Sequence, residues 1–265
     1  MPLAADSSTP FADAFPGRTV LVTGAGHGFG RAIALAFAAR GANVVASDVR
    51  EAGLVETRGL VGDVSGTLQT EVVDVSDRLA VREYVEGAAA RFGRLDVIVN
   101  NAGGVLGQVG RPIEDVPEDD WHAIFGANLD GAFFTSQAAA PHFKAAGGGR
   151  IVNISSGAGL GVSLTGIQAY ASAKAGLIGL TRQLAHELGP ANITVNCIAP
   201  GFVRSNPTTE RQWQSYGPDG QRKLIEGIAL RRLGSVDDIA NGVMFFASDA
   251  AGWVTGQTLS VDGGR

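Results

Sequence analysis

Short runs of apolar, mostly β-branched residues alternate along the chain with longer stretches in which alanine and other apolar residues recur at helical spacing. The short runs are almost continuously apolar, which is typical of parallel strands covered on both faces. Strands are expected at residues 18–23, 43–47, 68–73, 95–100, 150–155, 192–198 and 257–261. Helices are expected at residues 29–39, 77–92, 119–145, 169–188 and 236–247.

This alternation implies βαβ units with right-handed crossovers. We therefore expect an α/β fold, a single-domain Rossmann-type doubly wound parallel sheet with helices on both faces. Residues 17–265 form that domain, and residues 1–16 are expected to be a flexible arm. Two places look irregular. Four glycines in residues 50–67 make a full crossover helix doubtful there, and Pro141 should kink or end its helix. Trp253, near the last expected strand, is expected to pack against the domain.

Composition excludes several classes of function. The 265 residues carry a net charge of −5, which argues against nucleic acid or an anionic membrane as the main partner. No apolar run is long enough to span a membrane, and the first residues do not resemble a signal peptide. The single cysteine, Cys197, rules out an internal disulfide and fits a reducing, cytoplasmic compartment. The histidines lack ligand spacing, so no metal is expected.

A glycine-rich turn joins the first expected strand to the first helix, with the sequence TGAGHGFG at residues 23–30. Glycines in this position permit a tight turn, close approach of the backbone to a pyrophosphate, and close packing of the helix on the strand. The helix N-terminus then offers free N–H groups to the phosphates. The turn predicts a dinucleotide site formed by Gly24, His27, Gly28, Phe29 and Gly30.

Asp48 ends the second expected strand, 18 residues beyond Gly30. A carboxylate at this distance accepts hydrogen bonds from the ribose diol and repels a 2′-phosphate, so NAD is the expected cofactor. Arg50 is close enough to soften this discrimination, and a solvated aspartate at a strand end is the alternative.

Tyr170 and Lys174 stand four residues apart on an expected helix, which places both side chains on one face. A nearby ammonium lowers the pKa of a phenol and makes it a better acid–base catalyst. Ser156 follows the fifth strand and can donate to a substrate oxygen. Asn128 lies among apolar residues, where it either holds a water in a proton relay or is a satisfied core amide.

These motifs, in this order, resemble the short-chain dehydrogenase/reductase family over about residues 17–264. The resemblance implies a catalytic tetrad of Asn128, Ser156, Tyr170 and Lys174. The interval from Ser156 to Tyr170 is one residue longer than expected, so Ser155 is a rival for the catalytic hydroxyl. The resemblance also implies a homotetramer, with residues 119–145 in the subunit interface.

The same resemblance assigns further cofactor contacts. Lys174 and Tyr170 would lie at the nicotinamide end, and Ser205 stands where threonine is usual. The implied contacts are Asp74 and Val75 at the adenine, Asn101, Ala102 and Gly103 along the cofactor, and Pro200, Gly201, Val203 and Ser205 around the carboxamide.

We expect an NAD-dependent oxidoreductase that transfers a hydride between nicotinamide and a secondary alcohol or carbonyl, the small-molecule partner. The polar stretch 205–227 is expected to be a substrate lid, and it favours a polyol or sugar-like substrate. One alternative is an NADPH-dependent carbonyl reductase of the 3-oxoacyl type. An alternative of another class is a non-catalytic cofactor-binding protein.

Overall fold

The computed structural model describes residue 11 and residues 14–265. Most of the expected flexible arm, residues 1–16, therefore lies outside the described residues. Its last part is packed, because Phe15 is fully buried with its ring centroid 4.8 Å from that of Phe37. Phe15 thus belongs to the folded domain.

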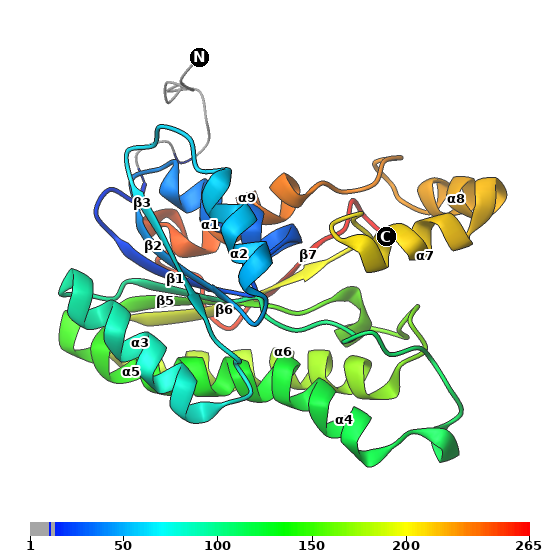
Figure 1. The fold of residues 1–265 in the computed structure, drawn as a ribbon, viewed down its shortest axis with the longest axis horizontal. Coiled ribbons are helices and arrows are strands. Elements are labelled where there is room, and N and C mark those ends of the chain that lie inside the picture. Colours follow the sequence, from blue (N-terminus) through cyan, green and yellow to red (C-terminus); the bar gives the residue numbers. More distant parts are fainter. Residues whose placement is uncertain (1–10, 12–13) are drawn as a thin grey trace.

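The centre of the molecule is a seven-stranded sheet of order β3-β2-β1-β4-β5-β6-β7 in which every pair is parallel (Figure 1). The chain order reverses beside β1, which has β2 on one side and β4 on the other. The expected doubly wound, Rossmann-type sheet is confirmed. The strands are β1 Thr19–Thr23, β2 Asn43–Asp48, β3 Thr67–Val72, β4 Val97–Asn100, β5 Gly149–Ile154, β6 Ile193–Pro200 and β7 Thr258–Val261.

Helices cover both faces of this sheet (Figure 1). One layer holds α1 Gly28–Ala38, α2 Glu51–Gly59 and α9 Val236–Ala247, and the other holds α3 Arg78–Phe92, α5 Gly131–Ala146 and α6 Gln168–Leu188. Three further helices, α4 Glu118–Phe125, α7 Pro207–Ser215 and α8 Gly217–Glu226, extend beyond the carboxyl ends of the strands.

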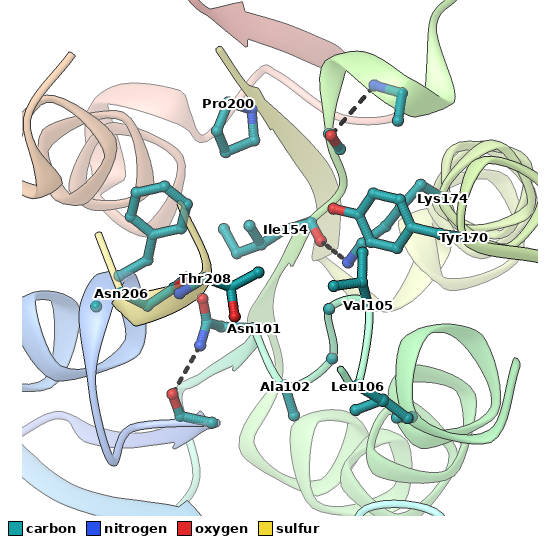
Figure 2. A pocket seen from close by; sticks show the side chains of 18 of the residues that line it. Asn101, Ala102, Val105, Leu106, Ile154, Tyr170, Lys174, Pro200, Asn206 and Thr208 are labelled. Carbon is teal, nitrogen blue, oxygen red and sulfur yellow. Dashed lines mark hydrogen bonds between the residues drawn. The ribbon is translucent and has the colours of Figure 1, made fainter. Parts of the chain in front are cut away.

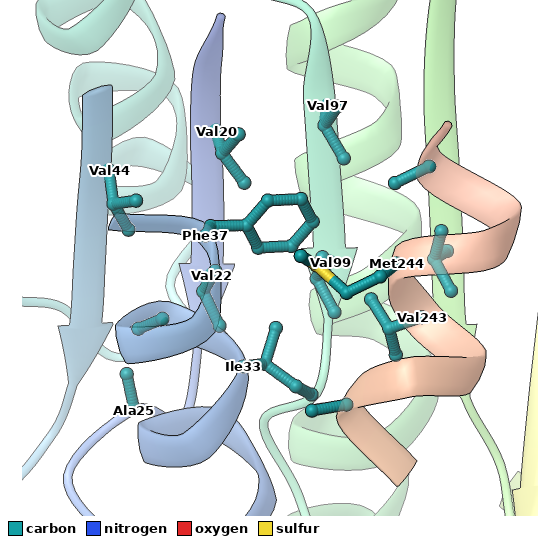
Figure 3. Packing of buried hydrophobic residues seen from close by; sticks show 14 of the residues in the cluster. Val20, Val22, Ala25, Ile33, Phe37, Val44, Val97, Val99, Val243 and Met244 are labelled. Atoms are coloured by element: carbon teal, nitrogen blue, oxygen red, sulfur yellow. The ribbon is translucent and has the colours of Figure 1, made fainter. Parts of the chain in front are cut away.

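The apolar core lies in two layers, one on each face of the sheet. Phe37 of α1 and Met244 of α9 pack over Val20 and Val97 of the central strands (Figure 3). On the other face, Phe143 belongs to a second buried cluster. Burial on both faces explains why the central strand segments are almost entirely apolar.

Residues 50–67 do contain a helix, contrary to expectation. The glycine at position 53 does not break α2, because a Cβ there would lie 2.7 Å from the Gly26 carbonyl oxygen. The absence of a side chain lets α2 pack on the glycine turn. Leu54 is buried, and the Thr57 hydroxyl donates to the Ala25 carbonyl at 2.8 Å.

Three other expectations were wrong in detail. The expected helix 119–145 is divided by a π-helical turn at Gly126–Asp130. Pro141 lies inside α5 without ending it. Trp253, expected to pack near β7, is fully exposed. No helix in the described part of the chain combines the length and apolar character of a membrane span.

Candidate active site

A cavity of about 1020 Å³ lies at the carboxyl ends of the strands, where open α/β sheets bind ligands. Its wall includes every residue that the sequence assigned to cofactor or catalysis except Gly30 and Asn128. The assigned residues in the wall are Gly24, His27, Gly28, Phe29, Asp48, Asp74, Val75, Asn101, Ala102, Gly103, Ser156, Tyr170, Lys174, Pro200, Gly201, Val203 and Ser205.

The glycine turn leaves an open cradle because its glycines have no room for a side chain. Gly24 has a φ of +67°, and a Cβ there would lie 2.7 Å from the Ala102 Cα. A Cβ on Gly30 would lie 2.2 Å from the Gly24 carbonyl oxygen, so Gly30 allows α1 to pack on the turn without itself facing the cavity. His27 precedes α1 and makes no side-chain cap bond. These residues fit a cofactor pyrophosphate at the N-terminus of α1.

Asn101 and Thr23 fix the turn to the neighbouring strand. The Asn101 amide donates to the carbonyls of Thr23 and Gly24 at 2.9 and 3.0 Å. The Thr23 hydroxyl in turn accepts from the backbone N–H groups of Asn101 and Ala102 at 3.1 and 3.0 Å. The side chain of Asn101 therefore holds the cradle in shape (Figure 2).

Asp48 is buried at the end of β2 and faces the same turn. One carboxylate oxygen accepts from the Gly26 N–H at 2.9 Å, and the other accepts from the Arg50 N–H at 2.9 Å. The Arg50 guanidinium is 3.5 Å away and half-exposed. Burial, followed by the charge of Arg50, lowers the pKa of His27, which keeps this imidazole neutral at pH 7. Asp48 and Arg50 thus place a carboxylate and a half-exposed guanidinium at this end of the cavity.

Asp74 and Val75 follow β3 and line the cavity at the same end. One Asp74 oxygen accepts from the backbone N–H and the hydroxyl of Ser76 at 2.9 and 2.7 Å. Val75 is buried, and a Cβ on Gly131 would lie 2.7 Å from its side chain. Close packing of α5 thus fixes the position of the Asp74–Val75 segment.

Tyr170 and Lys174 stand on the first turns of α6, and the Tyr170 hydroxyl points into the cavity (Figure 2). The Lys174 ammonium is buried and donates to the Ile154 carbonyl at 2.8 Å. Burial lowers the pKa of Lys174 to about 8. Burial also raises the pKa of Tyr170, against a smaller lowering by the neighbouring Ser156. The net shift is opposite to the lowering expected from Lys174, because the burial of the phenol dominates.

The two serines after β5 have different surroundings. Ser155 is buried, and its hydroxyl donates to the Lys174 backbone carbonyl at 2.8 Å. Ser156 accepts from the Ala158 N–H at 3.1 Å and lies near enough to Tyr170 to lower the pKa of the phenol slightly. Ser156 is therefore the hydroxyl available beside the phenol, whereas Ser155 ties β5 to α6.

Asn128 lies in the π-helical turn and is 1% exposed. Its amide nitrogen donates to the carbonyls of Gly104 and Ile124, both at 2.9 Å. Its amide oxygen accepts from the Gly104 N–H at 2.8 Å. A Cβ on Gly103 would lie 2.4 Å from that oxygen. The Asn128 side chain is thus a satisfied core amide that fixes the loop after β4. This is the second of the two roles that the sequence allowed, the other being to hold a water.

The segment after β6 closes the remaining side of the cavity. Val203 is buried and forms an isolated parallel bridge with Gly234. A Cβ on Gly28 would lie 2.9 Å from the Ser205 carbonyl oxygen, so this segment lies directly on the glycine turn. The expected lid at residues 205–227 consists of α7 and α8, and α7 follows Asn206, whose side chain caps it.

Sequence reasoning missed the apolar part of the cavity wall. Val105 and Leu106 come from the loop after β4 (Figure 2). Apolar residues within glycine-rich loops were a usable signal, because loops otherwise favour polar residues. The other missed apolar residues include Val162, Leu164 and Phe202. Among the described residues, no three His, Cys, Asp or Glu side chains are grouped as metal ligands.

Comparison with known proteins provides evidence that is independent of the geometry of the site. The model of a family described as enoyl-(acyl carrier protein) reductase matches residues 24–265. A 3-oxoacyl-(acyl-carrier-protein) reductase of Thermotoga maritima is 37% identical over 249 residues, covering 94% of this chain and 97% of that protein. A short-chain type dehydrogenase/reductase structure from Mycobacterium ulcerans superposes with a TM-score of 0.88 at 31% identity, covering 95% and 90% of the two chains. The chain belongs to the short-chain dehydrogenase/reductase family.

Two further relatives of this short-chain dehydrogenase/reductase carry different substrates in their names. A subunit of a (2S)-((R)-hydroxy(phenyl)methyl)succinyl-CoA dehydrogenase from Thauera aromatica is 40% identical over 251 residues, covering 94% and 96% of the two chains. A 7α-hydroxysteroid dehydrogenase structure, complexed with NADH and 7-oxo glycochenodeoxycholic acid, has a TM-score of 0.87 at 33% identity and covers 97% of each chain. Membership makes this chain an oxidoreductase that binds a nicotinamide cofactor.

Proposed function

We propose that this protein interconverts a secondary alcohol and its carbonyl compound with NAD as cofactor, and that Tyr170 is the acid–base catalyst. The observation that carries the proposal is the Tyr170 hydroxyl, which points into the cavity beside Ser156 and close to buried Lys174. The cofactor would supply or accept the hydride. It would lie from Asp48 across the glycine turn to Tyr170 and Pro200.

The protein's own residues account for the proton. In carbonyl reduction, Tyr170 donates its phenolic proton to the substrate oxygen while Ser156 donates a hydrogen bond to the same oxygen. In alcohol oxidation, the phenolate accepts that proton. Lys174 places positive charge near the phenol and favours the phenolate. Asn128 acts as a positioning residue through Gly104.

NAD is proposed over NADP because Asp48 is a buried carboxylate in the cavity wall. A 2′-phosphate beside it would bring two like charges together in a partly desolvated site. The relative crystallised with NADH is consistent with this choice. The competing NADPH-dependent 3-oxoacyl reductase is favoured by the name of the Thermotoga relative.

The substrate is proposed to have an apolar body, rather than being the polyol favoured by the sequence. Two polar side chains of α7 already have protein partners, since Glu210 pairs with Arg204 at 2.7 Å and the Gln212 amide donates to Tyr216 at 2.7 Å. The cavity wall also includes apolar side chains, among them Val105, Leu106 and Phe202. Apolar walls favour ligands that bury carbon.

A non-catalytic cofactor-binding protein would have no need to keep a phenol, a hydroxyl and an ammonium together. Tyr170, Ser156 and Lys174 are all present at one end of the cavity. We also propose a cytoplasmic homotetramer. Phe133 on α5 and Leu259 on β7 are each about two-fifths exposed, and both are apolar surfaces suited to subunit contact.

The test is a panel of secondary alcohols and ketones assayed with NAD(H) and NADP(H) by absorbance of the reduced nicotinamide. The panel should contain polyols, aryl or alicyclic alcohols and 3-oxoacyl thioesters. Preference for an apolar alcohol with NAD supports the proposal. Turnover of 3-oxoacyl thioesters with NADPH alone would establish the competing function instead.

A further inference from the structure

The strand order gives the cavity two chemically different ends. Asp48 ends β2 and Asp74 follows β3 toward one edge of the sheet, whereas Arg265 follows β7 at the opposite edge. Tyr170 and Pro200 lie between them, beside β5 and β6. A cofactor with its ribose at Asp48 and its reacting ring at Tyr170 leaves the Arg265 end for substrate.

The backbone around Arg265 is held in place on both sides. The Gly201 N–H donates to the Val261 carbonyl at 3.0 Å, and a Cβ on Gly201 would lie 2.7 Å from the Asp262 Cα. Farther along, the carbonyls of Gly263 and Gly264 accept from Leu230 and Ala229 at 3.0 and 3.3 Å. The segment therefore joins the end of β6 to the chain after α8.

The other lysine and arginine side chains of the cavity wall already have partners. Lys174 donates to Ile154, and Arg50 lies 3.5 Å from Asp48. Arg265 differs: within residue 11 and residues 14–265, its guanidinium has no hydrogen bond or ion pair. Its neighbour Asp262 instead accepts from the Gly264 N–H at 2.8 Å.

We propose that Arg265 binds a carboxylate carried by the substrate at the end remote from the reacting carbon. A guanidinium binds carboxylates with paired N–H donors, which gives orientation as well as attraction. This inference rests on the proposed function and narrows it to oxo acids and hydroxy acids with an apolar body. The N-terminus of α7 does not compete for the anion, because the Asn206 side chain accepts from the Thr208 and Thr209 N–H groups there.

The strand order places the two ends of the substrate on either side of β6. Ser156 follows β5 and Arg265 comes after β7, with β6 between them in the sheet. The ends of β5 and β7 are two strand spacings apart, about 10 Å. We therefore expect a carboxylate carried across a ring system or a chain of several carbons.

The experiment compares matched substrates on the full-length enzyme with NADH. Each apolar ketone carries either a distal carboxylate or the corresponding primary amide, which keeps the shape and removes the charge. We expect the wild-type enzyme to prefer the acid in kcat/KM. Because Arg265 is exposed, Arg265→Gln should reduce the acid-to-amide ratio by roughly three- to tenfold, mainly through KM. Arg265→Lys, which keeps the charge, should retain part of the preference.

Arg82→Gln is the matched control, since Arg82 is an exposed arginine on α3 that pairs with Glu86 outside the cavity. It should leave both kinetic constants at wild-type values. Equal losses on acid and amide in Arg265→Gln, a loss confined to phosphopantetheine thioesters, or weaker binding of NADH itself would overturn the proposal.

Failure of the proposed function is distinguished by a second measurement. Binding of the acid and the amide to the NADH complex is followed by cofactor fluorescence, which requires no turnover. A binding preference for the acid that Arg265→Gln removes supports the carboxylate site even if the reaction differs. Turnover of neutral ketones with no acid preference in either assay leaves the proposed function standing and refutes the site.

Discussion

The Lys174 ammonium lies 5.8 Å from the centre of the Tyr170 ring and donates its hydrogen bond to the Ile154 carbonyl, not to the phenol. Any effect of Lys174 on Tyr170 is therefore exerted through space, without a hydrogen bond. Burial raises the pKa of the phenol. Tyr170 is thus a protonated donor at neutral pH, as carbonyl reduction requires.

Replacing Tyr170 by phenylalanine removes the proton donor and leaves the ring in place. We expect turnover to fall by about 10²–10⁴-fold with little change in cofactor binding. Steady-state kinetics and cofactor fluorescence titration measure the two effects. Tyr84→Phe is the control, because the Tyr84 hydroxyl is buried in the core and donates to the Val45 carbonyl at 2.6 Å. Tyr84→Phe should lower the free energy of unfolding and leave turnover unchanged. Near-normal turnover of Tyr170→Phe would contradict the mechanism.

The pH dependence should differ between the two directions of reaction. Oxidation needs the phenolate, and the raised pKa of Tyr170 means that the phenolate fraction increases with pH through the alkaline range. Oxidation should therefore rise with pH, whereas reduction should stay flat until the phenol ionises. Lys174 is charged only below its pKa of about 8, so Lys174→Ala should lower oxidation mainly between pH 6 and 8, with weaker cofactor binding. Profiles of kcat from pH 6 to 10 for the wild type and Lys174→Ala test this. Profiles of the same shape in both proteins would contradict an effect of Lys174 on Tyr170.

Ser155 and Ser156 offer a matched pair of substitutions. Ser156→Ala removes the hydroxyl beside the phenol, and we expect a fall in kcat of about tenfold or more, at near wild-type stability. Ser155→Ala removes the bond to the Lys174 carbonyl and should lower the free energy of unfolding by about 1 kcal/mol. Denaturant unfolding and kinetics distinguish the two. The reverse pattern would make Ser155 the catalytic hydroxyl.

The sequence was sufficient for the fold and for most of the cavity wall, because both depend on local patterns. Strands that are apolar on both faces require helices on either side of a sheet, and a glycine turn between strand and helix suits a bound phosphate. Gly53 was misread because a glycine that permits helix packing looks the same in sequence as one that breaks a helix. Its role is visible only from Gly26, which lies beyond a strand.

Other features depend on contacts between distant segments. Asn128 was assigned to catalysis, but its partner Gly104 is 24 residues away. Trp253 was expected to pack because large apolar residues usually do, yet whether a surface is covered depends on neighbours that a single sequence does not specify. The place of Arg265 in the cavity follows from the strand order, which brings the end of β7 beside β6.

Asp48 should determine the choice of cofactor. Asp48→Ala removes the charge that faces a 2′-phosphate, so the ratio of kcat/KM with NAD to that with NADP should fall, mainly through better use of NADP. Some loss with NAD is also expected, because Asp48 accepts from the Gly26 N–H. Asp74→Ala is a control that removes an acidic side chain at the same end of the cavity. A wild-type enzyme with equal efficiencies for both cofactors would contradict the assignment.

Lys174 should lower the free energy of unfolding, and the active site retains it for function. Burial lowers its pKa to about 8, against about 10.4 in an unfolded chain. Between these values the unfolded state holds a proton that the folded state lacks, so this residue makes stability rise with pH from about 8 to about 10. Below pH 8 the folded protein carries the full cost of a buried cation, up to about 3 kcal/mol.

Lys174→Met should therefore be more stable than wild type at pH 7 and lose that advantage by pH 10, because every other titrating group is common to both proteins. Loss of the hydrogen bond to Ile154, worth about 1 kcal/mol, offsets part of the gain. Urea unfolding of both cofactor-free proteins at pH 7 and pH 10 measures the difference. A Lys174→Met protein whose stability relative to wild type is the same at both pH values would show that the ammonium is not desolvated in the folded state.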